Sequence, residues 1–126
     1  MKRMKGVCII TQDIPRLRDF YQAVLQVEAE GDDTFTAFSG EVITLSLFTE
    51  PEMERMAPGS MRGAGRGSCT LEFEVDDVDQ EFERLTKLDV PIVKPPMTHS
   101  WGLRSVWFRD PDGNIVNFFS PVRSEG

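Results

Sequence analysis

The chain is poor in the residues that most often carry enzyme chemistry. Its 126 residues include one histidine, His99, and two cysteines, Cys8 and Cys69. His99 lies in a predicted loop, and the sequence identifies no Ser–His–Asp or Cys–His set around it. The cysteines match no CxxC pattern, and both fall in stretches typical of strands. We therefore expect buried free thiols in a reducing cytoplasm.

Basic charge and long apolar runs are also scarce. Asp and Glu number 21 against 14 Lys and Arg, for a net charge of −7. This balance argues against a general nucleic-acid binder, which needs clustered Lys and Arg. No run of about 18 apolar residues is present, so we expect no membrane-spanning segment. The Met-Lys-Arg-Met-Lys start lacks the apolar run of a signal peptide, and we expect a cytoplasmic protein.

What the chain does have is a pattern of strands and helices that occurs twice. Alternating apolar residues indicate strands, and helical spacing after Asp13 and after Asp77 indicates two amphipathic helices with Asp caps. A shift of 64 residues superposes Asp13 on Asp77 and Ile14 on Val78. The pattern predicts strands at 6–11, 28–30, 34–39, 41–49, 68–75 and 91–93, helices at 14–25 and 78–88, and loops at 50–67 and 95–102.

The last predicted element is a hairpin over residues 103–120. Pro111 and Gly113 suit a tight turn, and Asp110 and Asp112 can accept hydrogen bonds from turn amides. The flanking segments alternate, which places Trp107 on the face opposite Val106. Alone, such a hairpin is most simply structural.

The repeat predicts an α+β fold of two βαβββ modules that form a curved mixed sheet. Module one spans about 5–49, a linker or flap spans 50–67, and module two spans about 68–120, within a single domain of residues 1–126. Helices would cover one face of each half, which leaves the other face to form a ligand cup.

At this point the chain resembles the vicinal oxygen chelate superfamily, which includes glyoxalase I, extradiol dioxygenases and the fosfomycin- and bleomycin-resistance proteins. The resemblance extends over nearly the whole chain and implies paired βαβββ modules, often in a homodimer, with the cup as the functional site. The motifs that carry it are Asp13-Ile14, Asp19-Phe20-Tyr21, Val24-Leu25, the run from Leu71 to Val78, Trp101-Gly102, and the run from Phe108 to Asn114.

The resemblance also implies three metal ligands, and this chain departs from it at each position. Spacing from the matched motifs places the first ligand position at Gly6, the second at Thr70 and the third at Asn117. Glycine has no ligating side chain, and Thr and Asn are weak neutral donors. We therefore expect no metal cofactor. A rearranged site would have to draw on Cys8, Glu72 and Glu74, which alternation places on the same faces as Gly6 and Thr70.

Three functions remain open from the sequence. The first is a metal-free protein that binds or sequesters a planar or cationic organic ligand, as in the bleomycin-resistance branch. The second is a glyoxalase- or dioxygenase-type enzyme with a rearranged metal site, and the third is a non-catalytic module with a collapsed cup. For the first, stacking on aromatic rings and charge complementarity predict a ligand site. Its residues would be Thr70, Glu72, Glu74, Trp101, Trp107, Asn117 and Phe119, although Trp107 and Phe119 could equally be packed residues. His99 lies in a predicted loop, and no partner for a general base is visible there.

Overall fold

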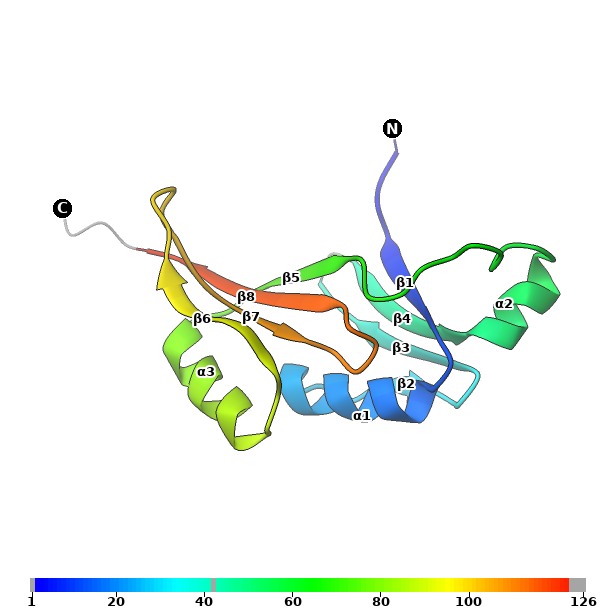
Figure 1. The fold of residues 1–126 in the computed structure, drawn as a ribbon, viewed down its shortest axis with the longest axis horizontal. Coiled ribbons are helices and arrows are strands. Elements are labelled where there is room, and N and C mark those ends of the chain that lie inside the picture. The colour runs from blue at the N-terminus through cyan, green and yellow to red at the C-terminus, as the bar shows by residue number, and fades with distance from the viewer. Residues whose placement is uncertain (1, 42, 123–126) are drawn as a thin grey trace. The chain divides into compact units, whose positions relative to one another are not determined.

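A computed structural model describes residues 2–41 and 43–122 of the chain (Figure 1). It divides into two compact units, Met1–Gly65 and Arg66–Gly126, called here the first and the second unit. Each unit contains one four-stranded mixed sheet. No helix within the described residues has the length and apolar character needed to cross a membrane.

The first unit is built from β1 (Gly6–Thr11), α1 (Ile14–Leu25), β2 (Glu30–Gly31), β3 (Phe35–Ser39), β4 (Thr44–Thr49) and α2 (Glu50–Met56). The strand order is β1-β4-β3-β2, with β1 parallel to β4. Asp13 caps α1, because its carboxylate accepts a hydrogen bond from the Arg16 amide. Leu17 and Tyr21 of this helix are fully buried, and the Tyr21 ring meets Phe38 of β3 edge to face.

The second unit repeats this plan with β5 (Thr70–Glu74), α3 (Val78–Lys87), β6 (Ile92–Thr98), β7 (Leu103–Arg109) and β8 (Ile115–Pro121). The strand order is β5-β8-β7-β6, with β5 parallel to β8. The rings of Phe73, Phe108 and Phe118 pack edge to face, and Leu85 of α3 is fully buried. The sheet face without a helix is called here the helix-free face.

The predicted α+β fold of two βαβββ modules is confirmed. Strand 6–11 and helix 14–25 have the predicted bounds, and the hairpin joins β7 to β8 as expected. The second strand of the first module is shorter than predicted, at two residues.

Two loop predictions were wrong. Residues Glu50–Met56 form helix α2, because the Thr49 hydroxyl caps its first turn and Pro51 occupies a favourable early position. Strand β6 continues through Pro95 and Pro96 to Thr98, where a loop was expected. As an edge strand, β6 tolerates the missing prolyl N–H groups.

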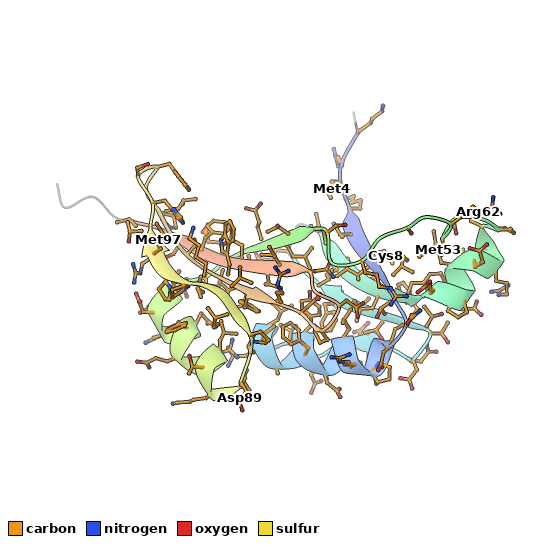
Figure 2. All side chains as sticks on the ribbon, in the orientation of Figure 1. Met4, Cys8, Met53, Arg62, Asp89 and Met97 are labelled. Atoms are coloured by element: carbon orange, nitrogen blue, oxygen red, sulfur yellow. The ribbon has the colours of Figure 1, made fainter. Side chains whose placement is uncertain are left out.

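The prediction of buried thiols was also wrong, because both cysteines are exposed. Cys8 lies on β1, on the face opposite Ile9 (Figure 2). Cys69 precedes β5, and its sulfur donates to Asn114 Oδ1 at 3.1 Å. Partial desolvation and the nearby Asp110 carboxylate raise the pKa of the Cys69 thiol, which favours the protonated, donating form.

The β7–β8 turn is held by the buried carboxylate of Asp110. Its Oδ1 accepts hydrogen bonds from the amides of Asp112 and Asn114, both at 2.9 Å, and its Oδ2 accepts from Asn114 Nδ2 at 2.9 Å. Gly113 has φ 93°, a conformation that strains other residues. The turn therefore sets the register of β8 against β7.

Removing this carboxylate should weaken the fold. We expect Asp110→Ala to lower the free energy of unfolding by about 2–3 kcal/mol, because several buried donors lose their acceptor. Urea unfolding followed by circular dichroism measures the change. Asp112→Ala is the matched control in the same turn, and we expect it to change stability by about 0.5 kcal/mol or less. Equal effects of the two substitutions would contradict this role of Asp110.

Helix α3 is tied to β7 by a bidentate ion pair on the helix-covered side of the sheet. Arg104 Nε and one of its terminal nitrogens donate to the two carboxylate oxygens of Asp79, at 3.0 and 2.8 Å. These hydrogen bonds lower the pKa of the Asp79 carboxyl below its ordinary value. Because the pKa is lower in the folded chain, the ion pair stabilises the fold at pH values above the ordinary pKa of an aspartate. This stabilisation is lost as pH falls through the pKa of the folded chain.

We expect Asp79→Asn to lower the free energy of unfolding at pH 7 by about 0.5 kcal/mol, since exposed ion pairs are weak. The difference from the parent chain should begin to shrink below the ordinary carboxyl pKa of about 4, where the unfolded chain is protonated first, and should vanish below the lowered pKa of the folded Asp79 carboxyl. Unfolding curves at pH 7, 4 and 3 measure it. Glu83→Gln, on the exposed side of α3, is the control and should show no such trend.

Candidate functional site

The helix-free face of the second sheet carries a row of four polar or aromatic side chains, one from each strand. Glu72 of β5 pairs in register with Asn117 of β8, which pairs with Trp107 of β7, which pairs with Lys94 of β6. Register partners place their side chains on the same sheet face. The row therefore runs from the acidic Glu72 on the edge strand β5 to the basic Lys94 on the opposite edge strand, β6.

The flanking rows hold most of the other predicted site residues. Glu74, Phe119 and Ser105 are register partners on one side of the first row. Thr70, Ile115 and Arg109 are partners on the other side. The sheet thus brings together six of the seven residues predicted to bind ligand: Thr70, Glu72, Glu74, Trp107, Asn117 and Phe119.

Trp101, the seventh, lies in the loop between β6 and β7. Its side chain is exposed, and its ring stacks on His99 with centroids 4.3 Å apart and planes 9° from parallel. One face of this indole is therefore already covered by a residue of the same loop.

Lys94 is the member of the site that the sequence analysis missed. Ile92 pairs with Phe108 on the helix-covered face, and strict alternation would place Lys94 there too. A register shift between Ile92 and Lys94 pairs the lysine with Trp107 instead. Such bulges redirect side chains, and here the ammonium reaches 4.6 Å from the centre of the Trp107 ring.

A second shift, between Lys94 and Met97, brings Met97 opposite Ser105. His99 then closes the cluster: its Nε2 lies 3.0 Å from Lys94 Nζ and 3.1 Å from Ser105 Oγ. An ammonium can only donate, so the ring nitrogen is the acceptor in its contact with Lys94. Lys94 thus contacts the ring nitrogen of His99 and the indole face of Trp107. Among residues 2–41 and 43–122, no carboxylate forms an ion pair with it.

Two polar atoms in the middle of the first row have no partner. Trp107 Nε1, a donor, and Asn117 Oδ1, an acceptor, are shielded from solvent and make no hydrogen bond in the described part of the chain. Buried polar groups are normally hydrogen-bonded, and an unpaired one is destabilising. A ligand that moves the covering side chains aside can accept a hydrogen bond from the indole N–H and donate one to the amide oxygen.

The residues at the positions of the implied metal ligands do not fit a metal ion. Thr70 and Asn117 offer only weak neutral oxygen or nitrogen donors. Gly6 offers none, and a Cβ built there would lie 2.8 Å from the Thr44 carbonyl oxygen. No three His, Cys, Asp or Glu side chains gather for metal binding among the described residues.

Comparisons with known proteins bear on the family and the fold. A family model described as the Glyoxalase/Bleomycin resistance protein/Dioxygenase superfamily matches residues 3–118. The uncharacterized protein YraH of Bacillus subtilis is 24% identical over 124 residues, which cover 93% of this chain and 97% of YraH.

Two solved structures are similar along most of the chain. A glyoxalase/bleomycin resistance protein/dioxygenase family enzyme from Burkholderia phytofirmans has a TM-score of 0.84 at 18% identity, covering 96% of this chain and all of the other. A lactoylglutathione lyase from Agrobacterium tumefaciens has a TM-score of 0.77 at 24% identity, covering 95% and 94%. At these identities the likeness shows the fold alone.

The contrast between Gly6 and Thr70 can be tested by placing a histidine at each position. We expect Gly6→His to lower the free energy of unfolding by about 1–3 kcal/mol, because its Cβ meets backbone and β1 or β4 must shift. Thr70→His is the matched variant at an exposed strand position and should be tolerated. Urea unfolding measures both. A Gly6→His chain as stable as the parent would contradict the steric argument.

Proposed function

The chain belongs to the glyoxalase/bleomycin resistance protein/dioxygenase superfamily, and on that premise we propose that it binds a planar organic small molecule without a metal ion. The proposed site is the helix-free face of the second sheet. Its role would be to bind or sequester the molecule.

The observation that carries this proposal is the unpaired pair of Trp107 Nε1 and Asn117 Oδ1. A buried donor and acceptor on adjacent strands destabilise the free protein, and a ligand that satisfies both removes that penalty. Such groups among aromatic side chains are typical of small-molecule sites, in which a few polar atoms orient a mostly apolar ligand. Phe119 supplies further aromatic surface in the neighbouring row.

Charge complementarity supports an amine or another cationic group on the ligand. Glu72 and Glu74 are exposed on β5, and neither has an ion-pair partner in the described part of the chain. A ligand cation near these carboxylates would form charge-assisted contacts.

The competing function is a glyoxalase- or dioxygenase-type enzyme with a rearranged metal site. The donor chemistry at Gly6, Thr70 and Asn117 argues against it, and fold alone is only associational evidence for chemistry. The family resemblance also implies a homodimer, and we propose that state for this chain.

The proposal can be tested with bleomycin and acridine orange as probes on protein dialysed against EDTA. We expect at least one probe to raise the melting temperature, since saturation at 100 times the dissociation constant adds about 2.7 kcal/mol of stability. Trp107→Phe, which keeps a ring but loses Nε1–H, should weaken bleomycin binding about tenfold, the equivalent of one hydrogen bond to a carbonyl of the probe. Trp101→Phe, in the exposed loop, is the comparison and should weaken it less.

Elemental analysis of the purified protein decides between the two functions. Stoichiometric Zn, Ni, Mn or Fe, together with loss of binding on its removal, would support the metal-dependent enzyme. No thermal shift with either probe, with or without metal, would contradict small-molecule binding at this face.

A further inference from the structure

Opposite charges lie at opposite edges of the helix-free face of the second sheet. Lys94 is on the edge strand β6, and Glu72 and Glu74 are on the other edge strand, β5. The strands between them contribute Asn117, Phe119 and Trp107, which are uncharged. Arg109 shares this face, but its guanidinium donates to the Gly113 carbonyl oxygen beside the turn at 2.8 Å.

The β6 edge has a surplus of hydrogen-bond donors. The Lys94 ammonium has three N–H groups, and one hydrogen bond to His99 leaves the others available. Trp107 Nε1–H is also unpaired. With no carboxylate paired to Lys94 in the described residues, this end of the row is suited to an anionic oxygen group such as a carboxylate.

The β5 edge has a surplus of acceptors. The carboxylates of Glu72 and Glu74 can only accept when ionised, and Asn117 Oδ1 on the adjacent strand is unpaired. This end is suited to an ammonium group. Because Lys94 already occupies one face of Trp107, a ligand cation is better placed beside the glutamates than stacked on this indole.

We infer that the ligand is zwitterionic: a flat molecule with an acidic group that contacts Lys94 and Trp107 Nε1, and an amine that contacts Glu72, Glu74 and Asn117. This inference rests on the proposed function and narrows its ligand class. The Lys94 ammonium lies over Trp107 of β7, two strands from β5, and strand spacing sets that separation at about 10 Å between backbones. An aromatic ring with para substituents has a length of the same order, which suits it to bridge the two edges.

Three compounds of the same shape test the inference by isothermal titration calorimetry: 4-(aminomethyl)benzoate, 4-methylbenzylamine and 4-methylbenzoate. The first carries both charges, the second only the positive charge and the third only the negative charge. We expect the zwitterion to bind about tenfold or more tightly than either singly charged compound, since two charge-assisted contacts replace one.

Substitutions at the two edges should act on different compounds. Lys94→Met should weaken the zwitterion and 4-methylbenzoate about tenfold and should not weaken 4-methylbenzylamine, because only the anionic contact is lost. Glu72→Gln combined with Glu74→Gln should weaken the zwitterion and 4-methylbenzylamine about tenfold and should not weaken 4-methylbenzoate, because only the cationic contact is lost. Lys87→Met and Glu83→Gln, both exposed on α3, are the matched controls and should leave all three affinities unchanged.

The outcomes separate this inference from the proposed function. If 4-methylbenzylamine binds as tightly as the zwitterion and Lys94→Met changes neither, the ligand class is wrong while small-molecule binding stands. If none of the three compounds binds, the inference is overturned, and the bleomycin and acridine orange titrations decide the proposed function independently. Circular dichroism of each variant ensures that a lost affinity reflects the site and not unfolding.

Discussion

The hydrogen bonds that Asp110 accepts in the β7–β8 turn determine which side chains share the helix-free face of the second sheet. Its buried carboxylate holds the amides of Asp112 and Asn114, and this turn aligns Trp107 with Asn117. A slip of one residue would send Asn117 to the helix-covered face and bring Phe118 out of the core. The turn therefore contributes to placing the unpaired donor and acceptor side by side at the centre of the candidate site.

Those parts of the site that lie on regular strands could be predicted from the sequence. Alternation assigned Glu72, Trp107 and Asn117 to one face because β5, β7 and β8 keep an unbroken ladder. The helices were equally predictable, since Asp13 and Asp77 cap them and apolar residues follow at helical spacing. In each case the signal is local and nothing from elsewhere in the fold overrides it.

Lys94 and its contacts could not be predicted by the same reasoning. Alternation counted from Ile92 gives the wrong face, because a register shift between Ile92 and Lys94 pairs the lysine with Trp107. The contact of His99 with Ser105 joins a loop to a strand, and no periodicity reports such an approach. The exposure of the Cys8 thiol was missed for a related reason: a strand has two faces, and β propensity does not say which one is covered. Cys69 was expected in a strand but precedes β5.

The two units have equivalent strand orders, but their helix-free faces carry different side chains. In the first unit, β1, β3 and β4 place only uncharged residues there, among them Cys8, Ser46 and Phe48, and the edge strand β2 adds Glu30. The equivalent strands of the second unit carry Glu72 and Glu74, and its bulged edge strand adds Lys94. Since the backbone plan is common to both, these side chains must carry any difference in binding. The close approach of Thr44 to Gly6 extends this argument to metals: the first implied ligand position lacks both a donor and the space for one, so a single substitution there would not create a metal site.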